Sequence, residues 1–301
     1  MTKKTTLNQV TDFDLRLLRL FKTVSECGSF SAAESVLGIT KSAISLHMSD
    51  LEKRLGMRLC QRGRAGFALT DEGREVLRAG AAVLAAIEGF RSEVNELHQQ
   101  LRGDLNIGII NNLVTQPQMR ITSAFKAIRG QGTGVRINLS MSTPLEIERG
   151  ILDGRLHVGA VPIITPLSGL DYRTLYEERS YLYCSVGHPL FTRSTHISKD
   201  ELGRTDAVAP SYRMTAEAIG LHQLLNCAAT ASDREGIAFL ILTGSYVGFL
   251  PDHYASNWVA RGQMKPINPD QLFFEAPLAI VTRKGRRPNL ILEHFLNALS
   301  H

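Results

Sequence analysis

A chain of 301 residues with 44% hydrophobic content predicts about two ordinary globular domains of roughly 150 residues each. No apolar run is as long as a membrane span, which needs about 18 consecutive apolar residues. No apolar segment follows Lys3 and Lys4, as it would in a signal peptide, so we expect a cytoplasmic protein without membrane contact. The net charge of +5 lies in residues 1–66, which hold eleven Lys and Arg against six Asp and Glu, whereas residues 67–301 hold twenty-three of each. A basic end joined to a neutral remainder is typical of a nucleic-acid-binding module attached to a part with another task.

Local signals predict two helices at the start of the chain. Apolar residues recur at helical spacing from Phe13 onwards, and Gly28 marks the end of this first helix. Ser31 and Glu34 have the spacing of a capping box, which predicts a short second helix that ends before Gly38.

A third helix is expected directly afterwards, capped by Thr40 and ended by Gly56. Its expected buried stripe is Ile44, Met48, Leu51 and Leu55. Two helices joined by a tight glycine-containing turn are typical of a helix-turn-helix, whose second helix places the residues near its start in the major groove of DNA. The alternative is the solvated face of a small helical bundle. The residues expected to contact DNA here are Ser31, Thr40, Lys41, Ser42, Ser45, Leu46 and Ser49, with Leu46 suited to a thymine methyl group.

Residues 58–70 predict two short strands around a glycine-rich turn, the wing of a winged helix. Arg62 and Arg64 in this segment are placed to meet DNA phosphates. Thr70 then caps a further helix that has Asp71 and Glu72 in its first turn, where negative charge suits the helix dipole.

Residues 15–80 resemble the DNA-binding region of the LysR-type transcriptional regulators. The matching stretches are, in order, 28–34 (GSFSAAE), 39–45 (ITKSAIS), 51–56 (LEKRLG) and 69–73 (LTDEG). The family usually has glutamine, proline, arginine and phenylalanine where this chain has Lys41, Ser42, Leu46 and Cys60. The resemblance implies a regulator that binds double-stranded DNA, and these four differences concern which DNA sequence is bound.

The helix that follows Thr70 carries a heptad seam, which predicts pairing with another helix along its length. The alternative is a long helix packed on its own domain. The family resemblance implies dimerisation through this linker helix, and we expect a homodimer that pairs into tetramers, with RNA polymerase as a further partner. The seam residues are Val76, Gly80, Val83, Ile87, Phe90, Val94, Leu97 and Leu101.

After Gly103 the pattern changes to alternating strands and helices, which predicts right-handed crossovers and a mostly parallel sheet. Loops 162–168 and 266–269 are the expected crossing points between two lobes. The expected strands are 104–110, 135–141, 156–161, 170–175, 180–186 and 278–282, and the expected helices are 117–128, 143–152, 219–225, 233–243 and 290–299.

Segments 103–108 (GDLNIG), 187–190 (GHPL) and 244–251 (GSYVGFLP) resemble the effector-binding domain of the same family, which has the fold of periplasmic solute-binding proteins. The fold class is therefore a winged helix-turn-helix, a long dimerisation helix and a two-lobed α/β effector domain. The expected divisions are 1–69, 70–102 and 103–301, with one lobe formed by 103–164 and 268–301 and the other by 165–267.

Small ligands in open α/β sheets bind outside the carboxyl ends of the strands, where helix N-termini offer N–H groups to anions. This rule predicts a small-molecule effector in the cleft between the lobes. Arg213 favours a carboxylate, and the aromatic residues favour a partly apolar one. The residues expected to line the cleft are Asn111, Asn112, Ser142, Thr143, Pro162, Ile163, Tyr212, Arg213, Ser245, Tyr246 and Phe249.

Two other functions are possible alternatives. An enzyme requires a catalytic constellation, and neither 244–248 (GSYVG) nor His188 provides one, so we expect no catalytic residues. A redox-responsive regulator with a Cys184–Cys227 disulfide is the other alternative, as in peroxide-sensing members of the family. The four cysteines have neither CxxC nor zinc spacing, so we expect reduced thiols, no metal and no cofactor. A solitary ligand-binding protein remains the interpretation if DNA binding fails.

Overall fold

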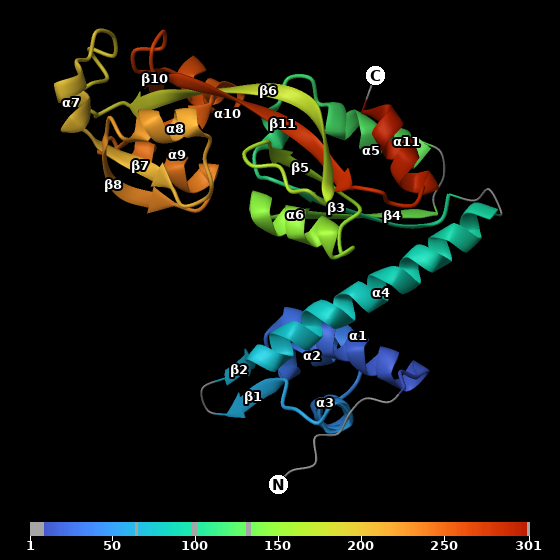
Figure 1. The fold of residues 1–301 in the computed structure, drawn as a ribbon. Helices are drawn as coiled ribbons and strands as arrows, with labels where there is room; N and C mark the ends of the chain where they lie inside the picture. The colour runs from blue at the N-terminus through green and yellow to red at the C-terminus, as the bar shows by residue number, and fades with distance from the viewer. Residues whose placement is uncertain (1–8, 64–65, 98–100, 131–133, 300–301) are drawn as a thin grey trace. The chain divides into compact units, whose positions relative to one another are not determined.

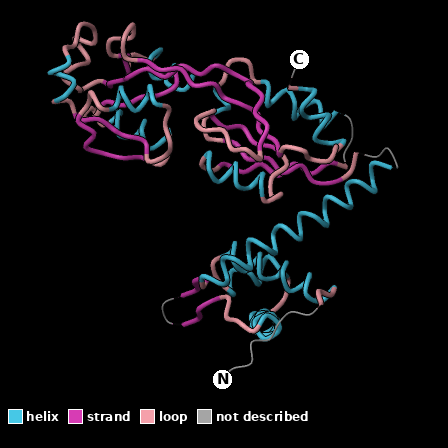
Figure 2. The backbone as a smooth tube through the Cα atoms, viewed as in Figure 1, coloured by secondary structure: helices cyan, strands magenta, loops and turns pink. Residues whose placement is uncertain are grey.

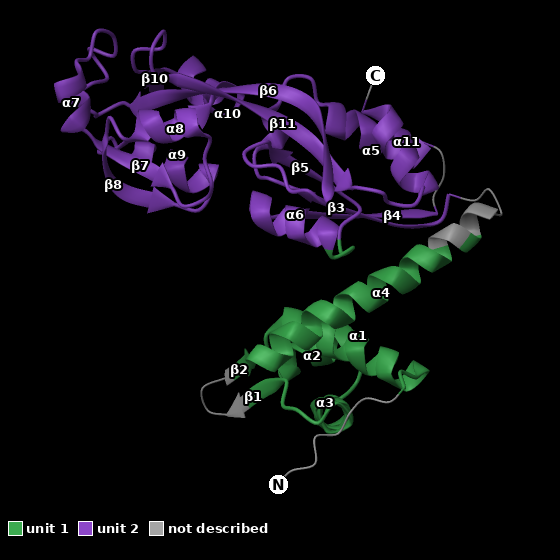
Figure 3. Ribbon diagram, viewed as in Figure 1, with its two compact units in different colours: residues 1–94, 153–155 green, residues 95–152, 156–301 purple. Residues whose placement is uncertain are grey.

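The computed structural model describes the chain except for residues 1–8, 64–65, 98–100, 131–133 and 300–301. The described chain forms two compact units (Figure 3): unit 1 is residues 1–94 with 153–155, and unit 2 is residues 95–152 with 156–301. In the part of the chain described, we find no helix whose length and apolar content suit a membrane span.

Unit 1 is a helical domain with a two-stranded wing (Figure 1). Strands β1 and β2 pair antiparallel, with Cys60 opposite Leu69 and Gly63 opposite Gly66. The core is formed by the apolar faces of the first three helices, where Phe21, Val24, Ile44 and Met48 are fully buried. The elements are α1 (Asp12–Cys27), α2 (Phe30–Leu37), α3 (Lys41–Leu55), β1 (Cys60–Gly63), β2 (Gly66–Leu69) and α4 (Asp71–Leu97).

The cap of α2 differs from the one expected. The helix begins at Phe30, so Ser29 is its N-cap and accepts from the backbone N–H of Ala32 at 3.0 Å. Ser31 lies exposed in the first turn instead. Glu34 is then too far along the helix to reach back, and its carboxylate accepts from the backbone N–H of Lys41. The expected capping box at Ser31 is therefore wrong, because it was placed two residues too late.

An ion pair fixes α3 against α1. Asp14 on α1 is 3% exposed and accepts hydrogen bonds from Arg54 of α3, with 2.7 Å between Arg54 Nη2 and Asp14 Oδ2. These hydrogen bonds, with further ones from Thr11, hold the pKa of the Asp14 carboxyl at about 2, against an ordinary 3.8. The pair therefore stays ionised at neutral pH and keeps the third helix in a defined position.

Unit 2 is built on one mixed sheet of nine strands in its described residues, with strand order β4-β3-β5-β11-β6-β9-β7-β8 and β10 paired with β6. The strands are β3 (Gly103–Ile109), β4 (Val135–Met141), β5 (Val158–Pro162), β6 (Leu170–Ser185), β7 (Asp206–Pro210), β8 (Asn226–Ala231), β9 (Val247–Pro251), β10 (Met264–Pro266) and β11 (Phe273–Arg283). The helices are the short η1 (Leu113–Thr115), α5 (Arg120–Gly130), α6 (Pro144–Leu152), α7 (Lys199–Gly203), α8 (Ala216–His222), α9 (Arg234–Leu242), α10 (Asp252–Ala260) and α11 (Leu290–Ala298).

Two lobes share this sheet. Lobe one contains β3, β4 and β5 in parallel with α5, α6 and α11, and lobe two contains the parallel strands β7, β8 and β9 with α7 to α10. The long antiparallel strands β6 and β11 run through both lobes (Figures 1 and 2). One end of β6 joins the lobe-one core at Leu170 and Leu175, and the other joins the lobe-two core at Leu182 and Cys184.

The crossing between the lobes therefore lies inside β6 and β11, and not in loops 162–168 and 266–269 as expected. Strands were expected at 170–175 and 180–186 because the polar run from Glu177 to Ser180 interrupts the apolar pattern. The strand continues because its backbone pairs with β11 on both sides of this run, from Leu170 to Tyr181, with Glu178 opposite Ala276. For the same reason the sheet is mixed where a mostly parallel one was expected. The helix expected over 117–128 begins at Arg120.

Candidate functional site

The outer face of α3 presents small polar side chains and one leucine. Ile44, Met48 and Leu51 are buried on the opposite face, which leaves the expected DNA-facing residues outward. Thr40 caps the helix, because its hydroxyl accepts from the backbone N–H of Ala43 at 3.3 Å. Of the remaining outward residues, Lys41, Ser42 and Leu46 are exposed, and Ser45 and Ser49 are half-buried.

The wing follows α3 as expected. Arg62 lies on β1 opposite Phe67 of β2, whereas Arg64 falls outside the described residues. Thr70 joins the wing to α4: its hydroxyl donates to the carbonyl of Arg58 at 2.7 Å and accepts from the backbone N–H of Gly73 at 2.9 Å. The start of α4 is thereby fixed to the DNA-binding module.

The heptad seam of α4 divides into two parts. Val76 packs against the unit 1 core and Gly80 is buried, so this first part serves its own domain. Val83, Phe90 and Val94 are 42%, 67% and 38% exposed. An apolar row this exposed on a long helix favours a second helix as its partner.

Unit 2 has a cavity of about 260 Å³ where strands from the two lobes end. From lobe one it is lined by the segments after β3, β4 and β5, and from lobe two by those after β7 and β8. The first turns of α6 and α9 both open into it. The lining residues are Ile110, Asn111, Met141, Ser142, Thr143, Pro144, Glu146, Pro162, Tyr212, Ser232, Asp233 and Arg234.

Five of the expected residues line this cavity: Asn111, Ser142, Thr143, Pro162 and Tyr212. Six others do not. Ser245 and Tyr246 lie on a turn as expected, but this turn precedes β9 and so lies at the amino ends of the lobe-two strands, whereas the cavity lies beyond their carboxyl ends. Phe249 lies on β9 itself and is buried against His222 and Phe274 in the core of lobe two.

The other three lie elsewhere for separate reasons. Asn112 is hydrogen-bonded to Tyr254, and Ile163 packs against the lobe-one core. Arg213 is exposed and does not line the cavity. The arginine at the cleft is instead Arg234, together with Ser232 and Asp233, and these three residues follow β8, a strand absent from the expected elements.

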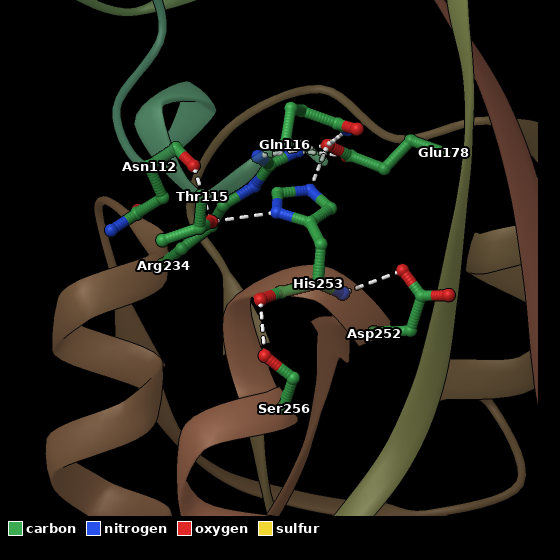
Figure 4. Close-up of polar contacts among 8 residues, drawn as sticks. All are labelled: Asn112, Thr115, Gln116, Glu178, Arg234, Asp252, His253 and Ser256. Carbon is green, nitrogen blue, oxygen red and sulfur yellow. Dashed lines mark hydrogen bonds and ion pairs between the residues drawn. The ribbon is translucent and has the colours of Figure 1, made fainter. Parts of the chain in front are cut away.

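Behind the cavity lies a buried polar network centred on Glu178, at the point where β6 crosses between the lobes (Figure 4). Glu178 is 3% exposed and accepts two hydrogen bonds from Arg234, one of them from Nη1 at 3.2 Å. His253 Nε2 lies 2.9 Å from the same carboxylate, and Gln116 Nε2 donates to it at 3.4 Å. The second imidazole nitrogen of His253 lies 2.7 Å from the hydroxyl of Thr115.

This network joins the two lobes through one carboxylate. Thr115 ends η1 of lobe one and Gln116 follows it, whereas Arg234 and His253 lie in the first turns of α9 and α10 of lobe two. Burial opposes the charge of Glu178, but the positive charge of Arg234 and the hydrogen bond with His253 outweigh it and hold the pKa of Glu178 below 4.5. The carboxylate is therefore ionised at neutral pH.

Tyr212 joins the network to the wall of the cavity. Its side chain is hydrogen-bonded to Arg234, and burial raises the pKa of its hydroxyl above the ordinary 10.0. Arg234 therefore connects the two, because it lines the cavity and also forms the ion pair with Glu178.

Both parts of the chain match known families. Residues 15–74 match the family described as bacterial regulatory helix-turn-helix protein, lysR family, and residues 98–301 match the LysR substrate binding domain. The chain belongs to the LysR family of transcriptional regulators. It is a DNA-binding regulator with an effector-binding domain.

Relatives cover almost the whole chain. The HTH-type transcriptional activator BauR of Pseudomonas aeruginosa is 66% identical over 300 residues, which is 99% of this chain and 98% of that protein. The LysR family regulator CbnR has the same fold, with a TM-score of 0.66 at 20% identity over 95% of this chain and 98% of that one. A structure of full-length CbnR complexed with its target DNA matches with a TM-score of 0.64 at 19% identity, over 95% of this chain and 98% of that one.

The disulfide alternative does not fit this fold. Cys184 lies on β6 and Cys227 on β8, and the sheet order places β9 and β7 between them. Three strand spacings amount to about 14 Å, whereas a disulfide requires Cα atoms within about 7 Å. Burial also raises the pKa of the Cys184 thiol to about 11, which is opposite to the shift that activates a redox-sensing cysteine.

Proposed function

We propose that this LysR-family chain is a transcriptional activator whose binding to double-stranded DNA is controlled by a small carboxylate held in the cleft of unit 2. The observation that carries the proposal is the full-length identity of 66% to a protein named as a transcriptional activator. The regulator acts as a homodimer paired through the exposed row of α4, and dimers associate into tetramers that meet RNA polymerase at the promoter.

The cavity supports a carboxylate as the effector. Two helices, α6 and α9, begin at its wall, and the N–H groups of a helix start attract anions. The cavity's own acidic groups are engaged locally: Glu146 accepts from Thr143, and Asp233 accepts from the backbone N–H of Gly236 at 2.8 Å. Arg234 adds a guanidinium at the wall, which donates two hydrogen bonds to Glu178 and has five N–H donors in all, so that a carboxylate in the cavity can accept from those not directed at Glu178.

The proposed response is a shift between two arrangements of the lobes. β6 and β11 connect the lobes, and the ligand cavity lies between residues of both. An effector that touches both lobes favours one arrangement, which changes how the dimers stack and how far apart the DNA-binding domains lie. The shift is as large as the difference in the effector's affinity for the two arrangements.

The first prediction concerns DNA binding. The full chain is expected to shift the intergenic DNA beside its own gene in an electrophoretic assay, and binding should weaken steeply with salt because phosphate contacts release counterions. Lys41→Ala should weaken binding and reduce the salt slope by about one. The control is Lys22→Ala, which removes the same charge from α1, outside the helix-turn-helix pair.

Two results would count against this proposal. One is a folded dimer that binds this DNA no better than nonspecific competitor, which would leave a solitary ligand-binding protein. The other is an equal loss from Lys22→Ala and Lys41→Ala, which would indicate a general effect of charge and not a contact of α3. Replacing Arg62 and Arg64 together by alanine tests the wing in the same assay.

The second prediction concerns the class of effector. In the same assay, small carboxylic acids are screened beside the neutral amides of the same shape, for example propionate with propionamide and benzoate with benzamide. We expect changes in DNA binding from members of the carboxylate set alone, and Ser142→Ala, at the cavity wall, should weaken the response of any active compound. Responses from the amides as strong as from the acids would exclude the carboxylate class.

A further inference from the structure

Lys41, at the start of α3, is the one side chain of residues 41–51 that belongs to the types that usually read bases. Residues 42–51 contain no Lys, Arg, Asn or Gln, and the arginine at position 54 is already bound to Asp14. The hydroxyl residues of this face reach only a short distance from the helix. Leu46, in contrast, is 59% exposed, and it is the large apolar side chain that the described part of α3 offers to solvent.

Leu46 stands in the middle of the face expected to meet DNA. Ser42 precedes it by four residues and Ser49 follows it by three, so these side chains are neighbours on one stripe of the helix. The opposite stripe is buried in the unit 1 core through Ile44 and Met48. An apolar side chain is thus surrounded by small polar ones, on a helix that Asp14 holds in place through Arg54.

The major groove displays one apolar group among the base edges, the C5 methyl of thymine. Guanine is normally read by arginine or lysine, and adenine by asparagine or glutamine. We infer that Leu46 reads a thymine methyl group in each half-site of the operator, and that this methyl determines specificity at that position. The inference rests on the proposed DNA binding and names the base feature that α3 recognises.

The size of the effect follows from the area buried. Burying one methyl group contributes about 0.8 kcal/mol, and 1.4 kcal/mol corresponds to a tenfold change in affinity. Removing the methyl should therefore weaken binding about fourfold for each half-site. Replacement of thymine by uracil removes this methyl and leaves the Watson–Crick pairing unchanged.

The experiment begins by selecting tightly bound duplexes from a random pool with the full chain. Each thymine of the selected half-site is then replaced by uracil, and affinity is measured for the wild-type protein and for Leu46→Ala. Alanine keeps the helix favourable at this exposed position. We expect one thymine per half-site at which uracil weakens wild-type binding about fourfold, and at which Leu46→Ala binds thymine and uracil DNA equally.

Val36→Ala is the matched control, since Val36 is also apolar and 67% exposed but lies on α2. It should retain the full uracil effect. Wild-type affinity that is indifferent to uracil at every position would overturn the inference, and so would a uracil effect undiminished in Leu46→Ala. Either result with specific binding intact leaves the proposed function standing, whereas a pool that yields no preferred sequence removes both.

Discussion

Glu178→Gln is expected to lower the free energy of unfolding of unit 2 by about 3–5 kcal/mol, although the two side chains have the same shape. The carboxylate is 3% exposed, and its loss leaves the guanidinium of Arg234 buried without a counter-charge. Urea unfolding followed by the fluorescence of Trp258 measures this directly, because Trp258 is the chain's single tryptophan and lies on α10 together with His253.

Glu177→Gln is the matched control on the same strand. Glu177 is exposed, so removal of its charge should change stability by less than about 0.5 kcal/mol. A second comparison replaces both Glu178 and Arg234 by glutamine. Because no unpaired charge is then left buried, the double variant should lose less free energy of unfolding than the two single variants lose together. Strictly additive losses, or equal losses from Glu177→Gln and Glu178→Gln, would contradict the role given to this pair.

The pH dependence has a definite sign. The pKa of Glu178 is lower in the folded chain than its ordinary 4.5, so its contribution to stability is complete above that value and is lost as the pH falls through the folded value. As the pH falls below 4.5, wild-type stability should therefore fall more steeply than that of Glu178→Gln. Identical slopes would mean that this carboxylate does not contribute through its charge.

The DNA-binding half was predictable because its signals are local. Caps, glycines and apolar spacing within a few residues identify three helices, the wing and the start of α4. The misplaced cap shows the limit of such signals. Ser29 and Ser31 are both serines before an apolar run, and the choice between them depends on where the backbone turns extended, as it does at Ser29 with φ −164°.

The cleft was only half predictable for the same reason. Asn111, Ser142 and Pro162 follow strands that the apolar pattern reveals. Arg234 follows β8, a strand of small and polar residues (NCAATA) that carries no such pattern. Arg213 was expected at the cleft because an arginine suits a carboxylate, but it is exposed, and the strand before it, β7, was not among the expected strands either.

The network behind the cleft is invisible to local signals. Glu178 lies in a polar run typical of a loop, and its partners Gln116, Arg234 and His253 are 62, 56 and 75 residues away. Glu178 is placed by the pairing of β6 with β11. Its partners are placed by η1, α9 and α10, which all bring residues to the middle of β6. Such contacts between distant segments are fixed by topology and not by spacing in sequence.

Gly73→Ala is expected to destabilise unit 1 by about 3 kcal/mol, the upper end of overpacking costs, and to abolish specific DNA binding. A methyl group at this position would lie 1.9 Å from the backbone carbonyl oxygen of Leu59, which cannot turn aside as a side chain can. The start of α4 must then move away from the wing and break the hydrogen bonds of Thr70 to Leu59 and Arg58.

Gly89→Ala supplies the control within the same helix. A Cβ at Gly89 meets nothing within 4 Å, so the substitution should stabilise α4 by about 0.5–1 kcal/mol through helix propensity and leave DNA binding intact. Unfolding followed by circular dichroism should show the lower stability of unit 1 in Gly73→Ala. The urea midpoint followed by the fluorescence of Trp258, which lies in unit 2, should not change. A stable Gly73→Ala variant that still binds DNA would show that α4 need not be held against Leu59. The wing could then change its orientation relative to α4, the helix expected to carry the dimer contact.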